Sequence, residues 1–118
     1  MNLLSPQFNN LQRLMDAAEL RHRVISHNLA NVNTPGYRRL DVNFEQVMAE
    51  QTASKSTGGR ATAPEVIEEE GLAVRADGNN VDIDREVGEL NQNAMLFQTY
   101  SQLLSSQFDM LRRATRGV

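Results

Sequence analysis

The stretch Ser26-His27-Asn28-Leu29-Ala30-Asn31-Val32-Asn33-Thr34-Pro35-Gly36-Tyr37 decides how this chain folds. Pro35 disfavours the helical conformation for the residue before it, so a helix that arrives here must end ahead of the proline. Proline at the second position of a four-residue turn and glycine at the third are typical of a type II turn, in which the glycine has a positive φ. Asn31 and Asn33 can cap the end of the helix. The stretch therefore predicts a helix stop followed by a sharp change of direction.

A long amphipathic helix is predicted ahead of this turn, over residues 5–33. Ser5 is a suitable N-cap and Pro6 fits the first helical position. Apolar residues then recur in steps of four and three, which is the 3.5-residue period of a coiled-coil seam. His22 occupies one seam position, where we expect a half-buried packing residue. The apolar seam positions are Leu4, Phe8, Leu11, Met15, Ala18, Ile25, Leu29 and Val32.

A second long helix is predicted over residues 82–116. Asp82 and Asp84 are suitable N-caps, and Arg112, Arg113 and Arg116 suit the C-terminal end of the helix dipole. Its seam has the same period, so the two ends of the chain are expected to pair as an antiparallel coiled-coil hairpin. The seam positions are Ile83, Val87, Leu90, Ala94, Phe97, Ser101, Leu104, Phe108, Leu111, Thr115 and Val118.

Residues 34–81 form an irregular insert between the two helices, and a chain of 118 residues leaves room for one domain at most. The insert should contain an extended stretch and a short helix around residues 44–50, followed by a flexible loop over 51–65. Val66-Ile67 and Leu72-Ala73-Val74 could form a small β-hairpin, and a further turn over residues 77–80 leads into the second helix. The predicted fold class is therefore mainly α.

The second helix also carries a surplus apolar stripe, formed by Leu96, Tyr100, Leu103 and Met110. A two-helix hairpin covers one face of each helix, so something else must cover this stripe. Either the insert folds back over it, or neighbouring copies of the chain bury it. The polar composition of the insert favours neighbouring copies. We accordingly expect the isolated monomer to be marginally stable and partly disordered.

Charge and composition narrow the function classes. The net charge is −3 and is unevenly distributed: residues 41–90 carry −8, whereas residues 1–40 carry +3 and residues 91–118 carry +2. The acidic middle of the chain argues against nucleic acid as a partner. The chain has no cysteine, so disulfides, thiolate metal sites and a cysteine nucleophile are excluded. Its start has no basic segment followed by a long apolar run, and we expect no cleaved signal peptide.

The usual constellations of catalytic or metal-binding residues are missing from the sequence. A calcium loop starting at Asp77 would place Val81, Asp82 and Gly88 at positions that require other residues. His22 and His27 are five residues apart, which does not place them on one helical face. We therefore predict no enzymatic activity, no cofactor, no bound metal and no small-molecule substrate.

The turn region also carries a family resemblance. Together, Asn28, Leu29, Ala30, Asn31, Val32, Asn33, Thr34, Pro35, Gly36 and Tyr37 resemble the N-terminal signature of the axial proteins of the bacterial flagellum, the family of rod, hook and hook-associated subunits. Residues 38–45 and 77–86 are similar to the proximal-rod members of that family. The resemblance does not cover residues 51–65. The stretch 78–86 argues against the FlgC type of proximal-rod subunit, which stays open as an alternative.

The resemblance implies a self-assembling structural subunit of the flagellar basal-body rod, whose terminal helices stack into a tube that transmits torque and forms the wall of the export channel. It implies FlgC, FlgF, the junction protein FliE, the membrane ring and the export gate as partners. It also implies a periplasmic position reached through the flagellar export apparatus, and contacts of the turn with adjacent subunits. A cytoplasmic helical-hairpin adaptor or chaperone is the alternative from another class, and it leaves the signature unexplained.

From this resemblance and the two seams we predict which residues form the assembling helix faces. They are Phe8, Leu11, Met15, Ile25, Leu29, Val87, Leu90, Phe97, Leu104, Phe108 and Leu111.

Overall fold

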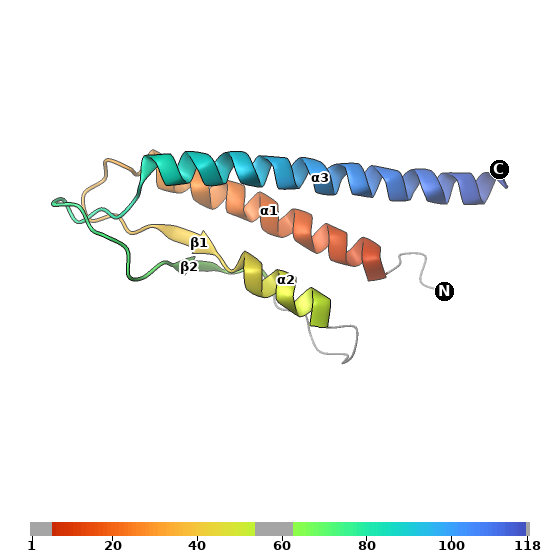
Figure 1. The fold of residues 1–118 in the computed structure, drawn as a ribbon, viewed down its shortest axis with the longest axis horizontal. Coiled ribbons are helices and arrows are strands. Elements are labelled where there is room, and N and C mark those ends of the chain that lie inside the picture. The colour runs from red at the N-terminus through yellow and green to blue at the C-terminus, as the bar shows by residue number, and fades with distance from the viewer. Residues whose placement is uncertain (1–5, 54–62, 118) are drawn as a thin grey trace.

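The computed structural model describes residues 6–53 and 63–117 (Figure 1). The predicted cap Ser5, the seam residues Leu4 and Val118, and most of the predicted loop 51–65 lie outside the described residues. The elements follow in the order α1 (Pro6–Ala30), β1 (Leu40–Val42), α2 (Phe44–Ala53), β2 (Val66–Glu68) and α3 (Ile83–Arg116).

The two terminal helices lie side by side and run in opposite directions (Figure 1). The molecule is elongated, with extents of 65 × 30 × 15 Å. α3 is the longer helix, with 34 residues against 25 in α1, and its C-terminal turns extend past the first turn of α1. The predicted mainly α fold, with long terminal helices packed on each other, is confirmed. None of the described helices is long and apolar enough to cross a membrane.

The helix ends follow the local sequence. Asp82 is the N-cap of α3, and its carboxylate accepts a hydrogen bond from the backbone N–H of Asp84 at 3.0 Å. α1 ends at Ala30, three residues before the predicted end. A tighter turn follows the helix, in which the N–H of Val32 donates to the carbonyl of Leu29, three residues earlier. Gly36 has a φ of 75°, and the N–H of Tyr37 donates to the carbonyl of Thr34 at 3.2 Å, as the predicted turn requires.

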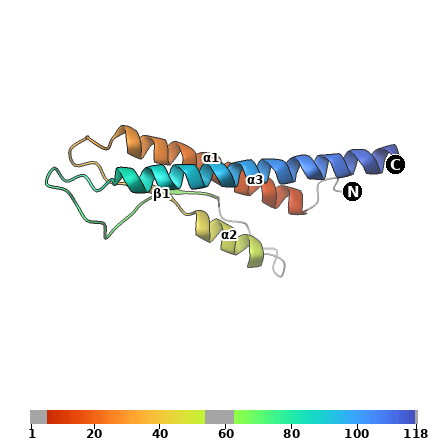
Figure 2. The same cartoon turned by 45° about the horizontal axis from the view of Figure 1, so that its top comes forward.

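The small sheet of the insert has a different pairing from the predicted one. β2 pairs antiparallel with β1, with Leu40 opposite Glu68 and Val42 opposite Val66, so the predicted hairpin of Val66-Ile67 with residues 72–74 is wrong. An isolated two-stranded hairpin is marginal in water, whereas β1 already packs against α1 and offers β2 a supported edge. The predicted short helix is confirmed as α2, which lies beside the helix pair (Figure 2).

The core centres on α1, which packs against α3 on one side and against β1 and α2 on the other. The insert contributes the buried side chains Val42, Phe44 and Val47, so it is less polar toward the core than we predicted. Of the surplus stripe on α3, Tyr100 is buried, while Leu103 is exposed. The main core cluster consists of Leu11, Ala17, Ala18, Phe44 and Tyr100, with Leu14, Met15, Leu96 and Leu104 packed against it.

The seam on α3 lies about one residue away from the predicted seam. Its buried residues are Glu86, Asn93 and Tyr100, spaced seven apart. The half-buried Leu90 lies between the first two, and the half-buried Leu104 follows Tyr100. Glu86 and Asn93 are buried because they have hydrogen-bond partners elsewhere in the chain. The apolar pattern had placed their neighbours Val87 and Ala94 inside instead. The seam residues Ile83, Val87, Phe97, Phe108 and Leu111 are instead 38–50% exposed.

The expected burial of Val87, Phe97, Phe108 and Leu111 inside the hairpin therefore needs correction. Phe108 still touches α1, since its ring meets that of Phe8 edge to face with 5.3 Å between centroids. On α1, Leu11 and Ile25 are buried, whereas Phe8, Met15 and Leu29 are half-buried. His22 was expected to be half-buried and is exposed.

Candidate functional site

Asn28 joins α1 to β1 at the closed end of the hairpin. Its side chain is fully buried. The Nδ2 group donates to the carbonyl of Leu40 at 2.7 Å, and Oδ1 accepts from the N–H of Leu40 at 3.0 Å. Oδ1 also accepts from the hydroxyl of Tyr37 at 2.8 Å. One amide side chain thus satisfies both backbone groups of a strand residue, which explains a polar residue on the core face of the helix.

Arg39 lies at the centre of a buried ionic cluster. Its guanidinium donates to the carboxylates of Glu86, Glu69 and Glu89, and to Asp41 at 3.1 Å. The side chain is almost completely buried. Burial lowers the pKa of Arg39, but hydrogen bonds to Glu86 and Asp41 and the nearby negative charges outweigh it, so the pKa is raised overall. The guanidinium therefore stays charged in the interior.

Two further arginines balance the charge of this cluster. Arg85 donates to both oxygens of Glu69 and to Glu89, each at 3.1 Å. Arg21 on α1 lies 4.0 Å from Asp41 and 3.9 Å from Glu89. We call this group the Arg39 cluster, and it consists of Arg21, Arg39, Asp41, Glu69, Arg85, Glu86 and Glu89. Three positive charges face four negative ones, so the cluster connects α1, the insert and α3 with little net charge.

Residues 77–80 lock onto the turn that follows α1. The Nδ2 group of Asn79 donates to the carbonyls of Asn31, Val32 and Thr34 at 2.9–3.1 Å, and so holds the turn after α1 from a distant part of the chain. The N–H of Gly36 donates to the carbonyl of Asp77 at 2.9 Å.

The backbones of Gly78 and Gly36 approach closely at this lock. Gly78 has a φ of 85°, and a Cβ atom there would lie 3.3 Å from the Cα of Gly36. Asn80 adds a bond to the insert, since its Oδ1 accepts from the N–H of Arg39 at 2.6 Å. The predicted signature turn and the stretch before α3 are therefore two halves of one junction.

The signature residues divide into an internal and an exposed set. Asn28 and Tyr37 bond to each other inside the fold, and burial followed by the charge of Glu86 raises the pKa of the Tyr37 hydroxyl. The side chain of Asn31 donates to the carbonyl of His27 at 2.8 Å, while Leu29 is half-buried. The residues that remain exposed at this end are Ala30, Asn33, Thr34, Pro35 and Gly36.

The sequence did not reveal the Arg39 cluster or the role of Asn79. Charged and amide side chains are normally assigned to the surface, and their partners lie up to 68 residues apart along the chain. The only usable signal was the seven-residue spacing of Glu86, Asn93 and Tyr100 on one helix. Within residues 6–53 and 63–117, no group of histidine or acidic side chains is placed to hold a metal ion. The carboxylates of the cluster surround a guanidinium instead.

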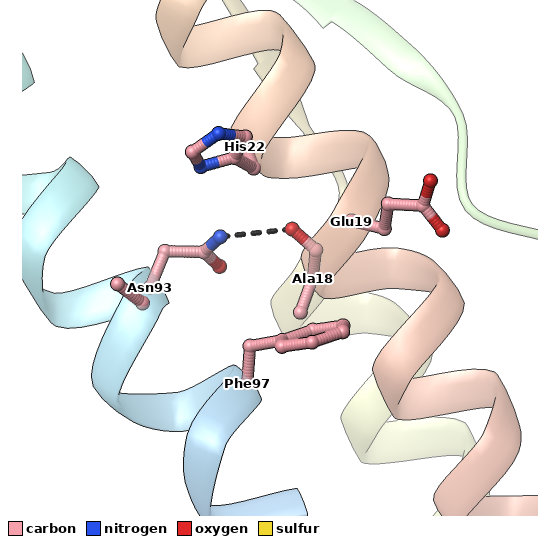
Figure 3. Close-up of a pocket in the computed structure, with 6 residues that line it drawn as sticks. Ala18, Glu19, His22, Asn93 and Phe97 are labelled. Atoms are coloured by element: carbon pink, nitrogen blue, oxygen red, sulfur yellow. Dashed lines mark hydrogen bonds between the residues drawn. The ribbon is translucent and has the colours of Figure 1, made fainter. Parts of the chain in front are cut away.

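A mostly apolar groove lies between α1 and α3 (Figure 3). It has a volume of about 290 Å³. The Nδ2 group of Asn93 crosses from α3 to the carbonyl of Ala18 on α1 at 2.8 Å. The groove is lined by Ala18, Glu19, His22, Asn93, Ala94 and Phe97.

Taken together, a long helical hairpin, a turn locked by buried polar groups and exposed apolar side chains along α3 are typical of a structural building block. Comparison with known proteins agrees with this. The family described as flagella basal body rod protein matches residues 9–38. The flagellar basal body rod protein FlgB of Aquifex aeolicus is 32% identical, over 82% of this chain and 82% of its own length.

Two more relatives match nearly the whole chain. FlgB of Bacillus subtilis is 24% identical over 99% of this chain and 98% of its own length. FlgB of Borrelia hermsii is 28% identical over 92% of this chain and 94% of its own length. The chain is thus a rod component of the flagellar basal body and not an enzyme. It belongs to the FlgB family of flagellar basal body rod proteins. These matches favour the FlgB type over the FlgC type and over an adaptor.

Proposed function

We propose that this chain assembles into the proximal rod of the flagellum, where its paired terminal helices pack lengthwise against neighbouring subunits. In that position it transmits torque and forms part of the wall of the export channel. The exposed apolar side chains of α3 carry the proposal, because large apolar side chains left exposed in such number along one helix mark protein–protein contacts. Its exposed apolar residues are Ile83, Val87, Met95, Phe97, Leu103, Phe108, Met110 and Leu111.

The Arg39 cluster supports a mechanical role. It joins α1, the insert and α3 at the closed end of the hairpin, so the helices should transmit torque without sliding past each other. At the other end α3 projects beyond α1 and is available for contacts with the next subunit. A contact between different surfaces of successive copies generates an open helical assembly when its rotation does not close into a ring.

The finer assignment rests on family membership. FlgC, FlgF, the junction protein FliE, the membrane ring and the export gate are the proposed neighbours, and the periplasm is the proposed compartment. Export would proceed through the flagellar apparatus without a cleaved leader. The turn residues Asn33, Thr34 and Pro35 are proposed contacts with adjacent subunits, since all three are exposed.

Basal bodies from cells that lack and then regain this chain test the proposal. Deletion should remove the rod and motility, and a tagged copy should restore both and co-purify with the rod. Intact rods in the deletion strain would contradict it. Sedimentation of the purified chain with rod partners distinguishes a rod subunit from an adaptor. An adaptor forms small closed complexes, whereas a rod subunit enters large axial assemblies.

A further inference from the structure

The groove between α1 and α3 contains a polar atom that the described part of the molecule does not satisfy. Asn93 is 2% exposed, and its Nδ2 group donates to the carbonyl of Ala18. This bond fixes the orientation of the amide and turns Oδ1 toward the Phe97 side of the groove (Figure 3). Oδ1 is buried and has no hydrogen-bond partner among the described residues. An unpaired buried acceptor is unfavourable, so a donor entering the groove would be bound there.

The rest of the groove suits an apolar side chain. Ala18, Ala94 and Phe97 line it, and its volume is about 290 Å³. A cavity of roughly 150 Å³ lined by apolar groups already accepts a benzene-sized molecule. One large aliphatic side chain together with the stem of an arginine therefore fits. The occupant should combine an apolar group with a nearby hydrogen-bond donor.

The projecting end of α3 carries that combination. Met110 is 64% exposed, and Arg113 lies three residues further on, which places the two side chains on the same face of the helix. A methionine sulfur packs favourably against an aromatic ring, and the groove presents Phe97.

Charge at the rim of the groove agrees with a cationic occupant. Glu19 lines the rim, and its present partner is Arg23 on the same helix, in an exposed pair. Exposed ion pairs of this kind contribute little stability, so Glu19 can exchange Arg23 for an incoming arginine.

We propose that the groove of one copy receives Met110 and Arg113 of a second copy, with Met110 packed on Phe97 and Arg113 donating to Oδ1 of Asn93. This inference rests on the proposed rod function and specifies one of its contacts. Ala94 and Met110 are sixteen residues apart on α3, which corresponds to about 24 Å along the helix. Two copies whose α3 helices point the same way are then displaced by about that distance along the helix axis. The copy that inserts its Met110 keeps its own groove open for a further copy.

Disulfide cross-linking tests this contact directly, because the natural chain has no cysteine. Differently tagged chains carrying Ala94→Cys or Met110→Cys are mixed, assembled and oxidised. We expect one predominant product that joins the two tags. Met95→Cys, at the neighbouring position, which is 69% exposed, replaces Ala94→Cys in the matched control and should give little product with Met110→Cys. Equal yields from both pairs, or a predominant product between two Ala94→Cys chains, would overturn the proposal.

The same experiment separates this contact from the rod function. If large assemblies sediment normally but the Ala94→Cys and Met110→Cys chains do not cross-link within them, the groove contact is wrong and the rod function stands. If the chain forms no assemblies, with or without basal-body partners, both are contradicted.

A second variant tests the unpaired oxygen itself. Asn93→Leu keeps a side chain of similar size and removes the acceptor. It should keep the helical circular dichroism spectrum and weaken self-association by about tenfold or more, which corresponds to one hydrogen bond to a charged donor. Asn91→Leu adds the same apolar group at an exposed position of the same helix and should leave self-association unchanged. Unaltered self-association of Asn93→Leu would refute the role of Oδ1.

Discussion

Asn28 and Arg39 show how single polar residues fix the arrangement of this chain. An amide side chain has a donor nitrogen and an acceptor oxygen on the same group, and Asn28 uses both on the backbone of Leu40. A buried network of this kind specifies one geometry, since any shift leaves polar groups unpaired. From the sequence we could predict that the helix stops near these residues, because proline and glycine act locally. We could not predict that Asn28 and Arg39 point inward, because their partners are distant in the sequence.

The ionic cluster predicts a non-additive mutational response. Arg39→Met leaves four carboxylates around an uncharged side chain and should lower the free energy of unfolding by about 3–5 kcal/mol. Glu86→Leu should also destabilise the chain, because it leaves the buried guanidinium without one of its partners.

The double variant should lose less free energy of unfolding than the two single variants lose together, by about 1 kcal/mol or more. The reason is that each single change already breaks the same interaction. Urea unfolding followed by circular dichroism measures all three variants. Additive losses would show that Arg39 and Glu86 are not coupled.

The two tyrosines predict a loss of stability at alkaline pH. Burial raises the pKa of Tyr100, and burial followed by the charge of Glu86 raises that of Tyr37. A phenol with a raised pKa in the folded state holds its proton more tightly there than in the unfolded chain. Its contribution to the free energy of unfolding is therefore complete below about pH 10, the usual pKa of tyrosine. It is lost as the pH rises through the raised pKa of the folded state.

Tyr100→Phe should flatten this alkaline decline, because the phenyl ring has no proton to lose. The chain has a single lysine and only two tyrosines, so few other side chains titrate in this range. Thermal unfolding between pH 9 and pH 11 is the measurement. Equal slopes for Tyr100→Phe and the natural chain would contradict the burial of this hydroxyl.

At the scale of elements, the periods in the sequence predicted which helices form but not how α3 is rotated. The lengths of α1 and α3 follow from the 3.5-residue repeat and the caps. Pairing on the apolar residues alone put Val87 and Phe108 inside, whereas hydrogen bonds to Glu86 and Asn93 turn α3 by about one residue. The pairing of β2 with β1 was missed for a similar reason, because the support that α1 gives to β1 is a tertiary effect.

Leu104 tests the seam at this scale, since it packs against the core cluster from α3. Leu104→Asp places a charge in the seam between α1 and α3 and should unfold the helix pair and abolish assembly. Gln102→Asp, two residues earlier and exposed, introduces the same charge and should retain both. Helical circular dichroism and sedimentation are the measurements. Normal helicity and assembly of Leu104→Asp would show that Leu104 does not lie in the seam.

At the scale of the whole molecule, the two long helices are covered unequally. α1 is packed on two sides, while the main contact of α3 is with α1. Several large apolar side chains along α3 therefore stay exposed in the monomer, including Leu103 and Met110. The polar junction closes one end of the hairpin, and these apolar side chains are left for other subunits to bury. The paired ends of the chain were predictable from sequence, whereas the junction that fixes them was not.

A cryo-electron microscopy map of basal bodies that contain this chain, with side chains resolved in the rod, tests the central claim most directly. We predict that α1 and α3 remain paired and antiparallel in the rod wall, with Asn28 against Leu40 and with Leu103 and Met110 packed against neighbouring subunits. A map in which α3 has separated from α1, or in which Leu103 and Met110 face solvent, would contradict the account.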